Sequence, residues 1–411
     1  MLQSKILIFL FQLVFVCVLV VACNSTTTIT ERSISTAGTV ATLNTKGCVK
    51  IYDPNIDYFP EKVRITHATG FVVEYHKHYK VVNVRNPWRN ADTTFQYVLV
   101  QCGTPVPEGF KETQVIKVPV NTVVSLSNTH LPHLEKLGLV DKLIGVSAFN
   151  QVNTPSVVQK IKAGKLTEVG NNASINVERL LELNPELVTT YGVGTEVDIY
   201  PKLLEAGLKV AINAEYMETS PLGKTEWLKF TALFFNHEAI AEQVFGEIAN
   251  RYQALATKAS KVKNRPTVFA GFNFKGTWYM PGGKSYMAKF LDDAKANYLW
   301  AADNSAGSLP LAFEAVFERA ATADYWLNGS LSWKSLQQVI TEDNRYADFT
   351  AVKKSHVFNN NARVNESGGN DYWESGISNP DLVLSDLIKI LHPELLPAHK
   401  LIYYRQMNLS K

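Results

Sequence analysis

The segment NVERLLELNPELV at residues 176–188 sets the architecture of the chain, because it joins a helix directly to a short strand. Asn176 is a favoured helix-capping residue, and the apolar positions after it predict a helix through Leu183. The residues that follow Pro185 predict a strand over 186–190. A similar order, AFEAVFERAATADYWL, recurs at residues 312–327, about 136 residues later. The recurrence predicts two lobes of one kind.

Strands and helices alternate outward from both copies. Short apolar runs predict strands at 122–126, 143–146 and 208–212 around the first copy, and at 267–271 and 356–358 around the second. Between the copies, apolar residues recur at steps of three and four from Ile240 to Leu255, which predicts one long helix. The expected class is α/β with doubly wound parallel sheets. We divide it into lobe 1 (119–236), a linking helix (237–264) and lobe 2 (265–411), with a ligand cleft between the lobes.

Residues 47–118 have a different pattern. Alternating β-branched and aromatic runs at 62–67, 71–75, 79–84 and 95–100, broken by Gly, Asn and Pro, predict hairpins. We expect a β-rich, antiparallel extension that packs on lobe 1. No residue of this extension indicates a chemical role.

The N-terminus carries an export signal. Lys5 precedes an apolar run from Ile6 to Val21, which is shorter than the ~20 residues of a spanning helix. The run ends before Cys23 in a pattern that resembles a lipobox, so we expect a signal peptide at 1–22, a lipid on Cys23 and a Ser/Thr-rich tether at 23–46. The alternative is an uncleaved anchor helix. Either way the body lies outside the cytoplasm: periplasm-facing, or on the cell surface in a single-membrane bacterium.

Two cysteines remain for the exported body, Cys48 and Cys102, and we expect them to form a disulfide. The alternative is a pair of unpaired buried thiols. The net charge of +3 is small for 411 residues, which argues against a nucleic-acid partner. No pattern for a structural zinc site occurs in the sequence.

Several motifs resemble those of the substrate-binding proteins of ABC importers for ferric siderophores, haem and cobalamin. Residues 176–188 are close to the family's N-x-E-x-(I/L)-x-x-L-x-P-D-L-V motif, and 311–316 are similar to its second-lobe counterpart. Residues 123–138, 220–230 and 368–376 also look like this family, and the resemblance covers roughly 115–395. It implies a helical-backbone fold, with two Rossmann-like lobes joined by one long α-helix.

The resemblance also implies partners. In this family one exposed glutamate on each lobe docks onto arginines of the membrane permease, which works with an ATPase. By motif position these are Glu178 and Glu314, and a carboxylate suits the planar arginine side chain. The alternative is that each glutamate only occupies a first helical turn, where the helix dipole favours it.

Ligands of α/β lobes bind at the carboxyl ends of the strands. The loops there are rich in aromatic and amide side chains with a few cations, which suits a large polar chelate. We expect a ferric siderophore whose chelator holds the iron, with no cofactor and no protein metal site. The expected ligand-binding residues are Asn128, His130, Tyr191, Tyr216, Phe274, Lys275, Trp278, Tyr279, Arg363, Tyr372 and Trp373.

Other functions stay open at this point. Cobalamin or haem are alternative ligands, and His130, Tyr191 or Tyr279 can serve as an axial haem ligand. An enzyme is disfavoured, because no nucleophile elbow, Walker loop or dinucleotide-binding glycine motif follows a strand. A further alternative is a sensor or scaffold lipoprotein that uses the fold without transport.

Overall fold

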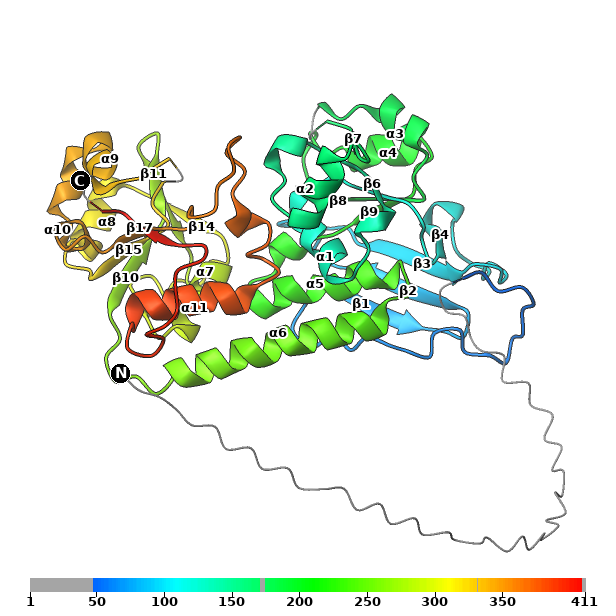
Figure 1. Cartoon of the computed structure of the whole chain (residues 1–411), viewed down its shortest axis with the longest axis horizontal. Helices are drawn as coiled ribbons and strands as arrows, with labels where there is room; N and C mark the ends of the chain where they lie inside the picture. Colours follow the sequence, from blue (N-terminus) through cyan, green and yellow to red (C-terminus); the bar gives the residue numbers. More distant parts are fainter. Residues whose placement is uncertain (1–46, 171–173, 331, 409–411) are drawn as a thin grey trace, which may run out of the picture. The chain divides into compact units, whose positions relative to one another are not determined.

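The computed structural model describes residues 47–170, 174–330 and 332–408 (Figure 1). The expected signal peptide, lipidation site Cys23 and tether lie outside the described residues. Within those ranges, no helix combines the length and the apolar character needed to cross a membrane.

Lobe 1 is built on a parallel five-stranded sheet in the order β7-β6-β5-β8-β9. The Asn176 side chain accepts a hydrogen bond from the amide of Arg179 and so caps α3, as expected from the sequence. The elements of this lobe are β5 (Val123–Ser125), α1 (Leu131–Lys136), β6 (Leu143–Val146), α2 (Pro155–Lys162), β7 (Thr167–Glu168), α3 (Val177–Leu183), β8 (Leu187–Thr190), α4 (Tyr200–Glu205) and β9 (Val210–Ile212).

Lobe 2 has a second five-stranded sheet, in the order β13-β10-β15-β16-β17, in which only β17 is antiparallel among the described strands. A small antiparallel sheet, β11-β12-β14, lies beside it. The elements are β10 (Thr267–Ala270), β11 (Phe272–Phe274), β12 (Thr277–Pro281), α7 (Tyr286–Asp293), β13 (Asn297–Tyr298), β14 (Ser308–Leu311), α8 (Phe313–Ala320), β15 (Tyr325–Leu327), α9 (Leu336–Glu342), α10 (Thr350–Lys353), β16 (Val357–Asn359), α11 (Pro380–Leu391) and β17 (Arg405–Gln406).

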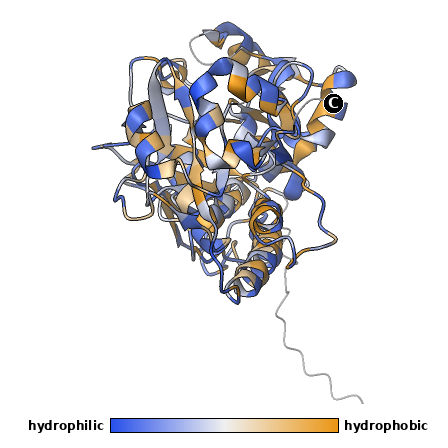
Figure 2. Cartoon of the chain, turned by 90° about the vertical axis from the view of Figure 1, so that its left-hand side faces the viewer, coloured by the Kyte–Doolittle hydropathy of each residue, from blue (hydrophilic) through white to orange (hydrophobic). Residues whose placement is uncertain are grey.

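One long helix connects the lobes. The long helix expected from the sequence is α6 (Glu238–Ala259), and it packs against α5 (Pro221–Leu233) and α11 (Figure 1). Every residue of α5 is buried, including the charged Lys224, Glu226 and Lys229, so the helix has no face exposed to solvent. The helices in Figure 2 show hydrophobic and hydrophilic residues on different sides, as expected of helices that cover a core.

The N-terminal extension is a four-stranded sheet in the order β1 (Phe71–Tyr75), β2 (Tyr79–Val84), β3 (Phe95–Gln101) and β4 (Val115–Val118). The first three strands are antiparallel as expected, whereas β4 runs parallel to β3. The strand predicted at 62–67 is wrong. The backbone amides of Thr66, His67 and Ala68 donate instead to the buried Glu226 carboxylate of α5, at 2.6–3.0 Å.

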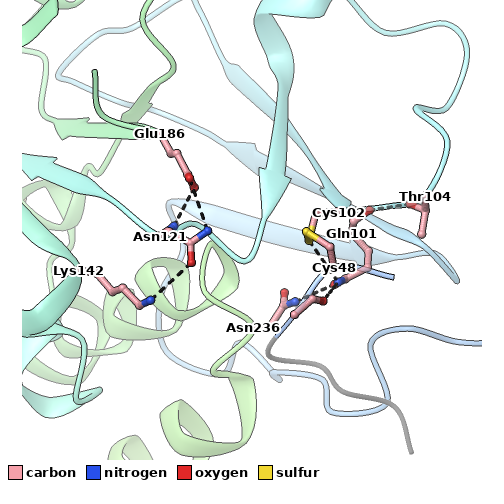
Figure 3. Close-up of a disulfide and its surroundings, with 9 residues drawn as sticks. Cys48, Gln101, Cys102, Thr104, Asn121, Lys142, Glu186 and Asn236 are labelled. Atoms are coloured by element: carbon pink, nitrogen blue, oxygen red, sulfur yellow. Dashed lines mark hydrogen bonds between the residues drawn. A yellow bond between two sulfur atoms is a disulfide. The ribbon is translucent and has the colours of Figure 1, made fainter. Parts of the chain in front are cut away.

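Buried polar contacts attach the extension to the rest of the body. Lys80 of β2 is fully buried, and its ammonium group lies 2.6 Å from Glu238 at the start of α6. A disulfide joins Cys48 to Cys102, directly after β3 (Figure 3). Beside it, the Asn236 amide donates to the Gln101 side chain at 2.8 Å, which links β3 to the turn between α5 and α6.

Candidate ligand site between the lobes

Three cavities have walls from both lobes, and two of them are lined by residues expected at the ligand site. The smaller of these two has a volume of about 380 Å³ and lies between the strand ends of lobe 1 and the segment that contains the 3-10 helix Asp371–Trp373 of lobe 2. Its lining is mostly polar and aromatic. It is formed by Leu126, Ser127, Asn128, Thr129, Ser147, Ala148, Gln151, Tyr191, Gly368, Asn370, Trp373 and Glu374.

The larger cavity has a volume of about 970 Å³ and a third wall from the extension. Lobe 1 contributes Val193 and 216–219, and lobe 2 contributes Pro281, 285–287 and 305–308. The extension contributes Thr69, Gly70 and residues 86 and 88–91 of the connection between β2 and β3. No sequence pattern predicts a contribution from this connection, because the residues of a hairpin loop do not indicate what the loop will contact.

Four expected ligand-binding residues line these cavities. Asn128, Tyr191 and Trp373 line the smaller cavity, and Tyr216 lines the larger one. The rings of Tyr191 and Tyr216 meet edge to face at 6.5 Å, so the two cavities adjoin at this pair. Burial, followed by the charge of Asp198, raises the pKa of Tyr216 to about 12. Its hydroxyl is therefore protonated at neutral pH and donates to the Gly192 carbonyl at 2.6 Å.

Three expected ligand-binding residues line neither cavity, because their side chains are buried in the core. Trp278 lies within β12 and is fully buried, and its indole donates to the Ala270 carbonyl at 3.0 Å. Tyr372 is 2% exposed and packs edge to face on Tyr404 at 5.8 Å. Composition alone does not tell whether an aromatic residue faces a cavity or the core.

His130 is the third expected ligand-binding residue whose side chain is buried. Its ring is buried below the strand ends of lobe 1, with Nε2 3.6 Å from the Glu215 carboxylate. Burial opposes ionisation of Glu215, but the His130 ring and a 2.6 Å hydrogen bond from Thr129 outweigh it and lower the Glu215 pKa to about 2. A neighbouring histidine, His133, has its pKa lowered to about 3, chiefly by burial. His130 therefore serves a buried polar network and does not face the ligand cavities as an axial ligand.

The other expected residues lie away from both cavities. Phe274 is the exposed last residue of β11, Lys275 lies in the turn that follows it, and Tyr279 lies on the exposed face of β12. Arg363 pairs through Nε with Asp371 at 2.9 Å and lines neither cavity.

Glu374, which is not among the expected ligand-binding residues, lines the smaller cavity and connects the two lobes. Its carboxylate accepts the backbone amides of Asn153 and Thr154 at 2.8 and 2.6 Å, across the boundary between the lobes. The Asn153 side chain and the Thr154 hydroxyl also donate to it. Despite these hydrogen bonds, burial raises the pKa of Glu374 to about 7. Asn365 adds a second interlobe contact, donating to the Asn150 carbonyl at 3.1 Å.

The two glutamates of the recurring motif occupy equivalent places. Glu178 lies in the first turn of α3 and Glu314 in the first turn of α8, and both side chains are exposed. Glu314 lies 3.4 Å from Arg345. Each lobe thus presents one carboxylate at a helix start.

Comparison with known proteins assigns the class. The family model of the periplasmic binding proteins matches residues 123–363, and the chain belongs to this family, whose members are substrate-binding proteins of ABC transporters rather than enzymes. An uncharacterized lipoprotein of Methanocaldococcus jannaschii is 29% identical over 366 residues, covering 82% of this chain and 84% of that protein. A vitamin B12-binding protein of Vibrio parahaemolyticus is 30% identical over 109 residues, 26% of this chain and 36% of that protein.

The fold is shared with solved structures. A possible iron-binding, periplasmic solute-binding protein of Staphylococcus epidermidis superposes with a TM-score of 0.52 at 19% identity, covering 66% of this chain and 98% of that one. This likeness confirms the expected two-lobed α/β fold. The family and the lipoprotein relative agree with an exported protein.

Proposed function

We propose that this protein captures a ferric siderophore between its lobes and delivers it to the permease and ATPase of an ABC importer. The observation that carries the proposal is the pair of adjoining cavities whose walls come from both lobes. Tyrosine, tryptophan, serine and asparagine side chains line them, which suits a large chelate with flat apolar parts and many oxygen atoms. In this proposal the chelator, and not the protein, supplies the iron ligands.

The likeness to the possible iron-binding protein of S. epidermidis supports an iron complex. Cobalamin is the second candidate, because part of the chain is 30% identical to a vitamin B12-binding protein. Haem would need an axial ligand, and Tyr191 is the expected candidate that lines a cavity.

A titration of the full chain in detergent micelles tests the ligand. Trp88 and Trp373 line the two cavities, so their fluorescence reports binding. We expect saturable quenching at submicromolar concentration by one class among ferric hydroxamates, ferric citrate, ferric catecholates, haem and cobalamin. The Trp373→Phe variant should lose part of the signal. If none of the five binds, the nutrient-capture proposal is wrong, and a sensor or scaffold role takes its place.

We propose that Glu178 and Glu314 dock on the permease, one from each lobe. Both are exposed, and arginine binds a carboxylate through two parallel hydrogen bonds. Glu182 on α3 and Glu318 on α8 are exposed glutamates on the same helices and provide matched controls. Uptake should fall about tenfold or more in Glu178→Ala/Glu314→Ala, with ligand affinity unchanged. Equal uptake in this variant and in Glu182→Ala/Glu318→Ala would contradict docking.

We further propose that Cys23 carries the lipid and holds the body at the membrane. The lipoprotein relative supports this assignment. Metabolic labelling with a fatty acid should mark the wild-type chain and not the Cys23→Ala variant. Labelling of neither protein would leave an uncleaved anchor helix as the explanation of membrane attachment, and labelling of both would place the lipid on another residue.

A further inference from the structure

The connection between β2 and β3, residues 85–94, crosses from the extension to lobe 2, and we call it the strap. Its first part is held against lobe 1. The Trp88 ring covers the loop after β8 so closely that a Cβ on Gly192 or Gly194 would approach the ring within 2.9 or 2.3 Å. Trp88 also packs on Tyr200, with ring centroids 5.9 Å apart.

Backbone geometry and Tyr216 fix the path of the strap. Asn86 and Asn90 adopt positive φ angles of 48° and 58°, a conformation that asparagine tolerates better than most residues. The Ala91 amide donates to the Trp88 carbonyl at 3.2 Å and closes a turn that contains Asn90. The Tyr216 hydroxyl, which donates to Gly192, also lies 3.3 Å from the Pro87 carbonyl. The strap is therefore attached to the wall of the ligand site.

The turn presents Arg89 to the opposite lobe. A Cβ on Gly307 would lie 1.7 Å from Nη2 of Arg89, so the guanidinium group rests directly against the Gly307 backbone of lobe 2. Thus one loop of the extension contacts both lobes and bridges the larger cavity. Any side chain at position 307 would clash with the Arg89 guanidinium group and displace it.

The charges around the larger cavity leave Arg89 available. Arg89 and Glu218 are the charged residues of its lining. Glu218 is 5% exposed, and its carboxylate already accepts the amides of Thr69 and Gly70 at 2.8 Å and the Trp227 indole at 3.0 Å. Within the described ranges, the Arg89 side chain has neither an ion-pair partner nor a hydrogen bond. A guanidinium with five donors facing such a cavity suits a carboxylate or another oxyanion.

We infer that the strap is the third wall of the ligand site, and that Arg89 selects chelates with an anionic group. This inference rests on the proposed function, since it assigns a ligand class to the same cavities. It gives the extension, which lies outside the matched family core of residues 123–363, a role in specificity.

The test compares Arg89→Gln with Arg85→Gln in the full chain. Arg85 is an exposed arginine of the same strap that does not line the cavity, so it controls for loss of charge alone. Binding of ferric citrate and a ferric tricatecholate, both anionic, is measured by equilibrium dialysis beside a neutral ferric trihydroxamate. We expect Arg89→Gln to weaken the anionic chelates about tenfold, equivalent to about 1.4 kcal/mol. The neutral chelate and the Arg85→Gln protein should change less than about twofold.

Each other outcome has a definite meaning. If the wild-type chain binds an anionic chelate and Arg89→Gln binds it equally well, or if Arg85→Gln weakens it to the same extent, the role of Arg89 is overturned while nutrient capture stands. Binding of the neutral chelate alone also overturns the inference. If the wild-type chain binds no iron chelate, the proposed function fails first, and the inference fails with it. Arg89 is exposed, so both variants should fold, which equal melting temperatures would verify.

Discussion

Ionisation of Glu374 should loosen the contact between the lobes. This residue is 2% exposed, and burial raises its pKa from the ordinary 4.5 to about 7. The folded protein therefore holds the Glu374 proton more tightly than the unfolded chain does. The resulting stabilisation is present in full below pH 4.5 and is lost as the pH rises through about 7. At ~1.4 kcal/mol for each pH unit between the two pKa values, it amounts to about 3 kcal/mol.

The Glu374→Gln variant isolates this contribution, because glutamine cannot ionise. Its amide group faces the donors of Asn153 and Thr154, so some stability is lost at every pH. The informative quantity is the difference in the free energy of unfolding between wild type and variant. Wild type should lose about 3 kcal/mol relative to Glu374→Gln between pH 4.5 and pH 8.

Urea unfolding at several pH values measures this difference, and for an m-value of about 3 kcal/mol/M the midpoints move relative to one another by about 1 M. Hydrogen exchange of the Asn153 and Thr154 amides reports the same event locally. Glu366→Gln, an exposed glutamate of the same segment, provides the control and should parallel wild type. A difference that stays constant from pH 4.5 to pH 8 would refute the reasoning, because the four hydrogen bonds would then have outweighed burial.

Further perturbations have defined outcomes. Lys80→Met leaves Glu238 buried without its partner and should destabilise the protein by about 3–5 kcal/mol in urea unfolding, whereas Lys80→Met/Glu238→Gln should recover most of the loss. Replacing Cys48 and Cys102 by serine removes a crosslink between residues 54 apart in sequence and should cost about 4 kcal/mol relative to the oxidised wild type, whereas the reduced wild type, as control, should match the variant. Trp278→Phe should cost about 2 kcal/mol in the core and leave chelate affinity unchanged; a fall in affinity would return this residue to the ligand site. Small-angle scattering with and without ligand should show only a small change in radius of gyration, and a large compaction would contradict a stiff linking helix.

The fold was predictable because local patterns determine it. The periodic apolar residues of 237–260 correctly indicated α6, and the Asn176 cap correctly indicated the start of α3. The failed strand at 62–67 shows the limit of such patterns. Its alternation is real, but its amides bind a carboxylate 160 residues away in sequence, on Glu226 of α5. The residues of 62–67 do not indicate that an acceptor so far away in the sequence will bind their amides.

The ligand site was less predictable for the same reason. Loop position correctly brought Asn128, Tyr191, Tyr216 and Trp373 to the cavities, since parallel strands end at one edge of a sheet. Whether an aromatic residue faces a cavity or the core depends on neighbours far along the chain, as Trp278 shows. Arg89 and Gly307 lie in contact although more than 200 residues separate them in the sequence, and no local sequence pattern predicts this contact.

The attachments of α6 explain why little rotation between the lobes is expected. At its lobe 1 end, Lys229 of α5 lies 2.9 Å from Glu242, and Lys80 of the extension binds Glu238. Toward lobe 2, Arg251 pairs with Asp381 of α11 at 2.6 Å, and the Tyr252 hydroxyl donates to Asp293 of α7 at 2.6 Å. A helix that is bonded to both lobes cannot bend without breaking several of these contacts at once, and the Lys80–Glu238 pair is fully buried. Ligand entry must then depend on smaller elements, the strap at Arg89 and the Glu374 contact, which bridge the lobes through exposed or titratable groups.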